Sequence, residues 1–166
     1  MPPFELRKDV IIAMTTTKID HQNGVLRICV DRLEGNQAGG RVFSQRLTAP
    51  MAFSDLGGLL LQLEALLERQ NFPQAFQRMR SFTSEAPEYP AGLLPTGAMS
   101  AETVAEAKGE KATFVLRILT RQNATWQGVL EWLEGEQRNN FSSDLEFLKL
   151  LEHDLRQSGG EASQNN

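Results

Sequence analysis

Few segments of this chain combine the residue types and spacing that chemistry requires. Residues Gly35–Val42 have the spacing of a phosphate-binding loop as far as Gly40. Arg41 then stands where that loop needs lysine, and Val42 where it needs the hydroxyl that holds magnesium. A predicted strand follows, whereas phosphate binding uses the N-terminus of a helix. We therefore interpret this segment as a hairpin loop.

The other reactive side chains stand alone. The two histidines are His21 and His153, and His153 has only sequence neighbours beside it, which do not face each other on a helix. Cys29 lies in a predicted strand without a histidine at useful spacing. A single cysteine cannot form an internal disulfide, which fits a reducing compartment. We predict no catalytic, metal-binding or cofactor-binding residue, and the sequence indicates no reaction.

A tryptophan beside a predicted hairpin turn is the strongest candidate for binding. Trp126 and Trp132 share one face of a predicted strand, so core packing beneath a helix is one interpretation. The other is a half-buried ring that stacks on a base or anchors a protein partner, together with the arginine and amides around it. The candidate partner-binding residues are Arg121, Asn123, Trp126 and Gln127.

A second candidate is a basic, amide-rich stretch that follows the first predicted helix. Arg69, Arg78 and Arg80 alternate there with several glutamines. The stretch is either a solvated connector or a nucleic-acid contact through Arg78 and Arg80. The second interpretation requires that these side chains meet Arg121 on one surface.

Two similar units must position these residues. Residues 26–28 (Leu-Arg-Ile) recur as 116–118, and residues 54–56 (Ser-Asp-Leu) recur as 143–145, at separations that agree within one residue. Each copy reads as a strand, a turn, a strand and a helix. We predict an α+β fold in which two ββα repeats form a four-stranded antiparallel sheet, with two helices on one face. The other face is then partly open to solvent or to a partner.

The two hairpins differ in their loops. In the first, residues 24–32 and 41–48 are the predicted strands, joined by a Gly-rich loop. In the second, residues 113–120 and 126–134 are the strands. With a turn centred on Ala124, Arg117 faces Glu131 and Leu116 faces Trp132, which gives an ion pair and an apolar pair.

Helix boundaries are marked by caps and breakers. The first helix begins at Ser54 or Asp55 and ends by about Gln70, because Pro73 cannot lie in its interior. The second begins near Ser143 and ends at residues 158–160 (Ser-Gly-Gly). Its predicted apolar face consists of Leu145, Leu148, Leu151 and Leu155, with Phe147 and Leu150 beside it.

The domain boundaries follow from these elements. Residues 1–82 form the first repeat with an N-terminal extension and a connector, and residues 113–157 form the second. Between them, residues 83–112 are an irregular acidic linker with a short helix over 101–108, and residues 158–166 are a disordered tail. Whether residues 8–19 add a strand, and whether 76–82 are extended or helical, stays open.

Composition limits the class of protein. The chain has 166 residues, of which 40% are hydrophobic, and a net charge of −4 that lies mainly in the linker. The predicted repeats are therefore nearly neutral, which disfavours a strongly basic nucleic-acid surface. No stretch approaches about 20 consecutive apolar residues, so we expect no membrane span and a cytoplasmic protein.

One stretch resembles known sequences. Residues 121–128 (RQNATWQG), followed by 129–133 and 143–151, are similar to a family of small uncharacterised bacterial proteins, and residues 71–74 (NFPQ) resemble their first halves. The resemblance spans both predicted repeats. It implies a bacterial source and a common fold, and it implies no activity or site.

Together these patterns predict a non-enzymatic protein-interaction or regulatory module. Self-association is one form of this, because open sheet faces and edge strands can pair with a second copy. The alternative is a weak single-stranded nucleic-acid binder that uses the sheet and the Arg-rich connector, with strongly salt-dependent affinity. Neither hypothesis requires a cofactor or a membrane.

Overall fold

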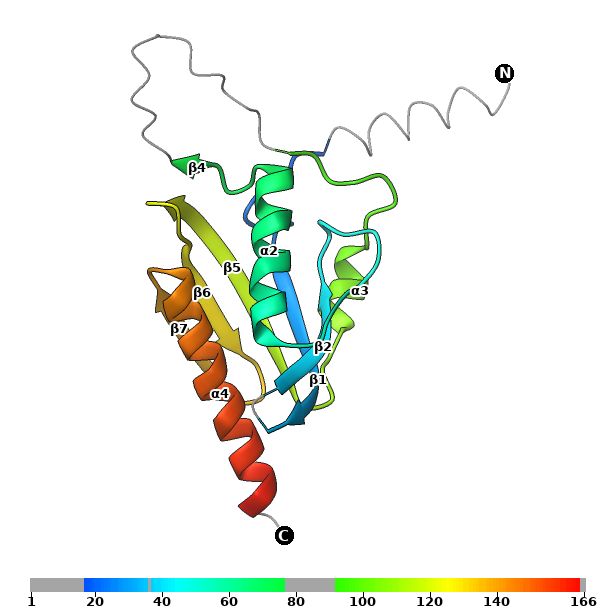
Figure 1. Cartoon of the computed structure of the whole chain (residues 1–166). Helices are drawn as coiled ribbons and strands as arrows, with labels where there is room; N and C mark the ends of the chain where they lie inside the picture. Colours follow the sequence, from blue (N-terminus) through cyan, green and yellow to red (C-terminus); the bar gives the residue numbers. More distant parts are fainter. Residues whose placement is uncertain (1–16, 36, 77–91, 165–166) are drawn as a thin grey trace, which may run out of the picture.

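The described chain is one antiparallel sheet with helices on both faces. The computed structural model describes residues 17–35, 37–76 and 92–164 (Figure 1). Six strands pair in the order β3-β2-β1-β5-β6-β7, and the two-residue β4 pairs in parallel with the end of β5. The α+β class predicted from the sequence is confirmed. The strands are β1 (Leu26–Glu34), β2 (Gln37–Phe43), β3 (Met51–Phe53), β4 (Ala75–Phe76), β5 (Ala112–Gln122), β6 (Gln127–Trp132) and β7 (Gln137–Phe141).

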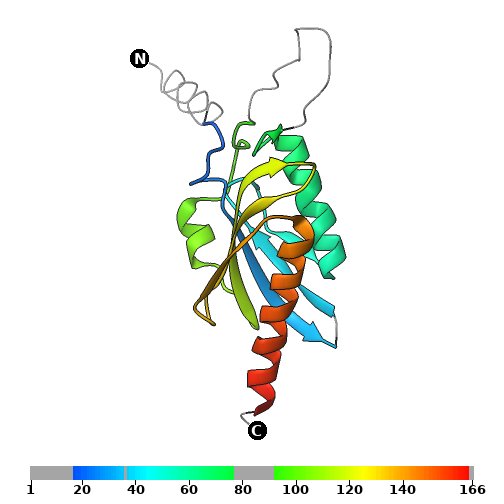
Figure 2. The ribbon, with the colours of Figure 1, turned by 90° about the vertical axis from the view of Figure 1, so that its left-hand side faces the viewer.

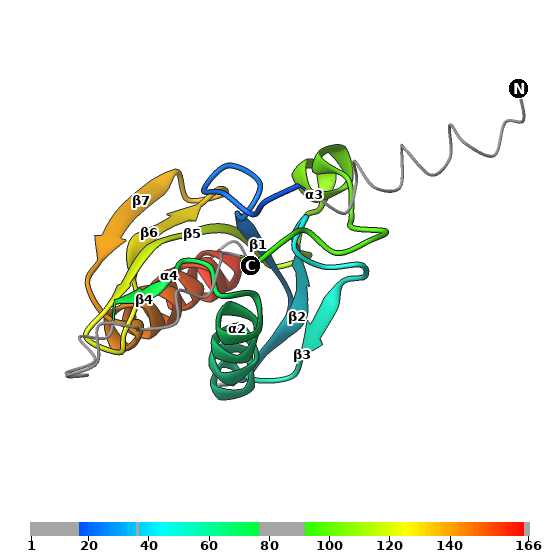
Figure 3. The same cartoon turned by 90° about the horizontal axis from the view of Figure 1, so that it is seen from above.

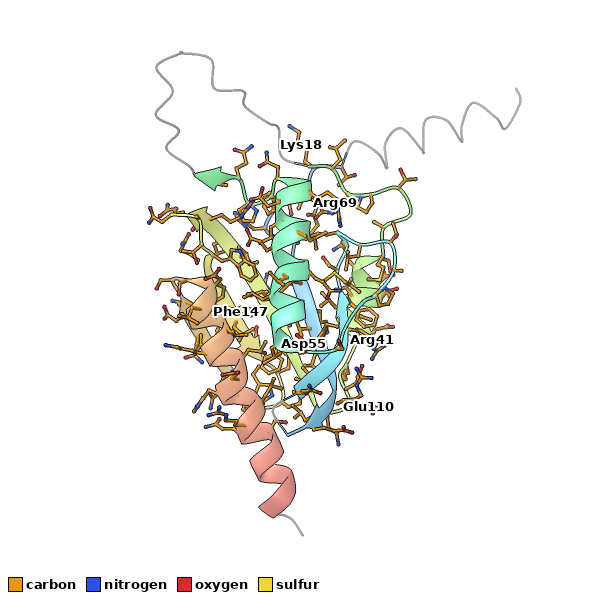
Figure 4. The ribbon with its side chains drawn as sticks, in the orientation of Figure 1. Lys18, Arg41, Asp55, Arg69, Glu110 and Phe147 are labelled. Carbon is orange, nitrogen blue, oxygen red and sulfur yellow. The ribbon has the colours of Figure 1, made fainter. Side chains whose placement is uncertain are left out.

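The described helices cover the two faces of the sheet unequally. Helices α2 (Leu56–Gln70) and α4 (Asp144–Gln164) lie on one face, which we call the inner face, and α3 (Ala101–Glu106) lies on the other, the outer face (Figures 2 and 3). Labelled Asp55 marks the start of α2 and labelled Phe147 the upper half of α4, so the two helices run in opposite directions (Figure 4). The main core lies between these two helices and the sheet. A smaller apolar cluster lies beneath α3.

Six strands form the main path of the sheet, whereas the sequence predicted four. The arrangement of two ββα repeats is therefore not confirmed. The order of three strands and a helix occurs twice, as β1-β2-β3-α2 and β5-β6-β7-α4. The additional strands escaped prediction because β3 has only three residues, and β7 is polar except for the buried Phe141. The predicted Gly-rich loop is also wrong, since residues 37–40 belong to β2. A side chain at Gly40 would lie 1.9 Å from the carbonyl oxygen of Cys29.

The β5–β6 hairpin has a tighter turn and a different register from the prediction. Asn123 and Ala124 both have positive φ (56° and 59°), and Thr125 donates its backbone N–H to the Gln122 carbonyl oxygen at 3.1 Å. This is the left-handed two-residue turn that suits a twisted hairpin. A bulge between Ile118 and Thr120 shifts the register further. The predicted pairs are therefore wrong, and the observed ones are Arg117 with Val129, Leu116 with Leu130, Val115 with Glu131 and Phe114 with Trp132.

The positive φ of Ala124 gives a direct prediction for stability. An L-residue with a Cβ is disfavoured in the left-handed region by about 1 kcal/mol, and glycine is not. Ala124→Gly is therefore expected to raise the free energy of unfolding by about 0.5–1 kcal/mol in urea titrations. Ala65→Gly, at an exposed position inside α2, is the control and should lower it by about 1 kcal/mol. A destabilised Ala124→Gly protein would contradict this account of the turn.

Two helices agree with the sequence-based boundaries. The Asp55 side chain caps α2 by accepting from the Gly58 N–H at 2.6 Å, and Asn71 ends the helix in a left-handed conformation. Helix α3 begins after Ser100, whose side chain accepts from the Thr103 N–H at 3.1 Å. The helix predicted over 101–108 thus exists, although the segment around it packs on the sheet and is not a free linker.

Helix α4 differs from the prediction in its face and its length. Its buried residues are Phe147, Leu151, Asp154 and Leu155, whereas Leu145 is 57% exposed. The helix continues to Gln164, so the predicted end at residues 158–160 is wrong, whereas the disordered tail predicted over residues 158–166 stays a prediction. Ser158 anchors the last turns by donating its hydroxyl to the Lys111 carbonyl oxygen at 3.0 Å.

Asp154 is a carboxyl group in the buried face of α4. It is 1% exposed, and its Oδ1 atom has no hydrogen-bond partner among the described residues. Burial raises the pKa of Asp154 above its usual value of 3.8, while nearby His153 opposes that shift. A carboxyl group with a raised folded pKa destabilises the protein at pH values above that pKa, and this effect disappears below the unfolded pKa.

Asp154→Asn is therefore expected to raise the free energy of unfolding at pH 7. The difference from the wild type should narrow as the pH falls through the folded pKa, and it should be smallest below pH 3.8. Urea titrations of both proteins between pH 3.5 and 7 measure this difference. The other carboxyl groups are present in both proteins, so their titration cancels in the difference. Glu152→Gln, exposed on the same helix, is the control. A gain that did not change with pH would rule out ionisation of Asp154 as its cause.

Several expectations concern residues outside those described. Of the extra strand considered over residues 8–19, only 17–19 are described, and Lys18 makes an isolated antiparallel bridge with Leu93. Of residues 76–82, Phe76 is described and belongs to β4. The linker residues 83–91 lie outside the described ranges.

Candidate interaction surface

The candidate Arg121 faces the protein interior. The bulge in β5 turns it onto the inner face, because a bulge changes the alternation of side chains along a strand. Arg121 is 4% exposed and forms an ion pair with Glu68. Its Nη1 also donates to the backbone carbonyl oxygens of Pro73 (3.1 Å) and Leu67 (3.4 Å). The side chain thus joins β5 to the end of α2 and the segment that leads into β4.

Trp126 occupies the same internal cluster. Its indole Nε1 donates to Oε2 of Glu64 at 2.5 Å, and its ring lies 5.6 Å from that of Phe147. Trp126 is 1% exposed, so the expectation of a half-buried ring is wrong and core packing is the correct interpretation. Beside it lies a cavity of about 70 Å³, lined in part by Arg121, Glu64 and Glu68. This volume holds a few water molecules at most.

Gln127 is also used within the hairpin. Its Oε1 accepts from the Thr120 hydroxyl (2.7 Å) and the Gln122 N–H (2.8 Å), and its Nε2 donates to the Gln122 carbonyl oxygen at 3.1 Å. At the next position, a side chain on Gly128 would lie 2.0 Å from the Arg117 carbonyl oxygen. Asn123 is exposed at the turn. The structure therefore brings the four candidates together, but Arg121, Trp126 and Gln127 stabilise the hairpin and α2.

The basic stretch does not form the surface that nucleic-acid binding required. Arg78 and Arg80 lie outside the described residues. Arg121 is buried against Glu68, so its guanidinium cannot reach a phosphate group in this structure. Among the described residues, the exposed large apolar side chains are all leucines, so none of them is an aromatic ring for base stacking.

The described residues show little chemistry elsewhere. Burial raises the pKa of the Cys29 thiol to about 11, so it is an unreactive thiol at neutral pH. Within the described ranges, no three His, Cys, Asp or Glu side chains are grouped to hold a metal ion. A groove of about 410 Å³ between α4 and the β1–β2 hairpin is lined by leucines together with Glu152 and Arg156. Of the helices described, none is both long and apolar enough to cross a bilayer.

The outer face of β5–β7 is a second candidate surface. We call it the outer sheet surface and define it by Arg117, Leu119, Val129, Glu131 and Arg138. Alternation places these side chains opposite the core, since Leu116, Ile118 and Leu130 point inward. In Figure 3, α3 lies over β1 and β2 on this face, and no described helix lies over β5, β6 or β7.

The chemistry of the outer sheet surface is mixed. Leu119 is 42% exposed, whereas Val129 on the same face is only 7% exposed. Arg138 is exposed opposite Glu131 on the neighbouring strand, and Arg117 is half-buried. Within the described part of the chain, no ion pair involves Arg117, Glu131 or Arg138. Arginine is enriched in protein interfaces, so Arg117 and Arg138 on the same face as the exposed Leu119 make this face a candidate interaction surface.

Sequence reasoning predicted an open face but not its residues. Arg117 was assigned to an ion pair with Glu131, which the register excludes. Leu119 could have been recognised as an apolar residue on the outward-facing side of a strand. Comparison with protein-family models, with curated proteins and with solved structures found no match for this chain. The evidence for the outer sheet surface as an interaction site therefore comes from its geometry alone.

Proposed function

We propose that this protein is a non-enzymatic interaction module that binds a protein partner through the outer sheet surface. The observation that supports this proposal is the exposed Leu119 on a sheet face that no described helix covers. The unpaired Arg117 and Arg138 provide charge selectivity around it. Most of the polar groups of the 121–128 segment are satisfied within the chain, so we place the binding site on the outer sheet surface and not at the hairpin tip.

A matched pair of leucine variants tests the proposal. Leu119→Glu introduces a charge on the outer sheet surface, and Leu61→Glu introduces the same charge at a 72% exposed position on α2. Tagged full-length proteins are used for capture from lysate of the source organism, with quantitative mass spectrometry. At least one protein should be captured by the wild type and by Leu61→Glu, and its recovery should fall at least tenfold with Leu119→Glu. Equal recovery with all three baits would contradict the proposal.

Two further arms separate the other hypotheses. Nuclease treatment should leave the capture unchanged, whereas its loss would favour a nucleic-acid partner. Analytical ultracentrifugation of the purified wild type and Leu119→Glu tests self-association, for which β7 is an available edge strand of the described sheet. A dimer that Leu119→Glu dissociates would identify a second copy as the partner.

A further inference from the structure

The two halves of the sheet correspond position by position. Each half has a bulge in its first strand, a glycine in its second strand opposite a buried phenylalanine in its third, and a capping side chain at the start of its helix. These counterparts are the bulges at residues 30–32 and 118–120, the pairs of Gly40 with Phe53 and of Gly128 with Phe141, and the caps Asp55 and Ser143. Residue numbers in the second half are 88 higher, as 128 is above 40 and 141 above 53. For a site in one half, this offset identifies the equivalent place in the other.

The cluster around Trp126 has such an equivalent place. Trp126 donates its indole N–H to Glu64 of α2 at 2.5 Å. Arg121 forms an ion pair with Glu68, and a cavity of about 70 Å³ lies beside them. The counterparts of Trp126, Arg121, Glu64 and Glu68 are Ala38, Leu33, Glu152 and Arg156. All four counterparts line the groove of about 410 Å³ between α4 and the β1–β2 hairpin, which we call the α4 groove. The larger space thus lies where an alanine stands in place of the tryptophan.

The α4 groove has apolar walls. Leu33 and Leu56 are half-buried on its sides, and Leu155 is buried on the side of α4. Ala38 lies at the floor and is 2% exposed, so a bound molecule would rest on the leucines above it. A volume of about 410 Å³ is within the range of small-molecule sites. The groove can therefore cover most of a small aromatic ring with apolar side chains.

Two charged side chains of α4 border these walls. Glu152 corresponds to Glu64, the acceptor of the indole N–H, and Arg156 corresponds to Glu68, so the charge at the second position is reversed. Glu152 and Arg156 are exposed and one helical turn apart, and within the described part of the chain neither forms an ion pair. The groove thus offers an acceptor for a ring N–H and a cation for an anionic group, both beside an apolar wall.

We propose that the α4 groove binds a small indole carboxylate, the class of ligand that includes indole-3-acetate. Its ring packs on the leucines of the groove, where this half of the chain has no tryptophan of its own. The ring N–H donates to the Glu152 carboxylate, as Trp126 donates to Glu64, and the ligand carboxylate pairs with the Arg156 guanidinium. The site is separate from the outer sheet surface, because α4 lies on the inner face, and it adds a small-molecule ligand to the proposed interaction function.

Indole-3-acetate is the probe for this proposal. It is titrated to millimolar concentration into the ¹⁵N-labelled full-length protein, and backbone amide shifts are followed by NMR. We expect saturable shifts centred on residues 33, 38, 56 and 152–156. The 1-methyl derivative lacks the ring N–H and the methyl ester lacks the charge, so each should bind at least about tenfold more weakly. No saturable shift, shifts centred elsewhere, or equal binding of the three compounds would each overturn the inference.

Matched variants test the role of the arginine. Arg156→Ala should bind indole-3-acetate at least about tenfold more weakly, because the charged hydrogen bond is lost, and should bind the methyl ester as the wild type does. Lys149→Ala removes the same charge at an exposed position of α4 that does not line the groove, and it should leave binding unchanged. Unchanged binding of indole-3-acetate by Arg156→Ala would contradict the proposal.

The source of the indole and the independence of the site are tested in the same titrations. N-acetyltryptophan amide carries the indole without a carboxylate, so it should bind weakly. If it bound as tightly as indole-3-acetate, the groove would be a site for a tryptophan side chain of a polypeptide, and the proposed class of ligand would be wrong. Leu119→Glu should bind indole-3-acetate as the wild type does. Loss of protein capture by that variant and loss of ligand binding by Arg156→Ala are therefore separate results, and either can fail alone.

Discussion

Replacing Arg121 with alanine is expected to lower the free energy of unfolding by about 3 kcal/mol. The guanidinium is 4% exposed and serves three parts of the chain at once, through Glu68, Leu67 and Pro73. Its removal takes a donor from the Pro73 carbonyl group and leaves a void beside the cavity of about 70 Å³. Glu68 is largely exposed and can regain water, which keeps the loss below that of a fully buried ion pair.

Arg117→Ala on the same strand is the control for this prediction. Its side chain lies on the outer sheet surface, where it makes no ion pair with described residues, so its removal should change stability by no more than about 0.5 kcal/mol. Guanidinium chloride titrations followed by circular dichroism measure both variants. Similar losses for the two substitutions would contradict the different roles that the bulge assigns to these arginines.

Trp126→Ala is expected to cost about 3–5 kcal/mol, the range for removing a large aromatic side chain from a packed core. The ring is 1% exposed and packs against Phe147, which in turn packs against Phe141 on β7. Its loss therefore loosens the contacts among β6, β7 and α4. The midpoint temperature of thermal unfolding should fall markedly, and the near-ultraviolet circular dichroism signal should weaken.

The hydrogen bond of Trp126 can be isolated with phenylalanine substitutions. Trp126→Phe removes the N–H that binds Glu64 at 2.5 Å, whereas Trp132→Phe removes an N–H that has no partner among the described residues. Both changes reduce the ring by a similar volume. Trp126→Phe should therefore be the more destabilising by about 1–2 kcal/mol, the cost of losing a hydrogen bond to a charged group. An equal cost would show that the Glu64 contact adds little to packing.

The starts of α2 and α3 could be predicted from the sequence because the residues that cap a helix lie within a few positions of its boundary. Asp55 caps α2, and Ser100 caps α3, through contacts with groups three positions further along. By contrast, the third strand of each half has little apolar content to mark it. Phe141 is the one buried residue of β7, and its pairing with Gly128 depends on a strand that comes earlier in the chain.

The role of the 121–128 segment could not be predicted from neighbouring residues. Trp126 binds Glu64, and Arg121 binds Glu68, at separations of more than 50 positions. The alternation of residues along a single strand is the same for a solvent-facing tryptophan and for a buried one. Long-range partners, and not local composition, decide which of these residues are accessible.

The pairing of β1 with β5 has a consequence for how the chain folds. These central strands join Leu26 to Leu116 and Val30 to Ala112, residues more than 80 positions apart. Contacts of such high sequence separation require a large loss of chain entropy before they are formed, which slows folding. Until they form, each half exposes an apolar strand edge that can pair with another molecule. During synthesis, the edge of β1 therefore stays unpaired until β5 has been made and can pair with it.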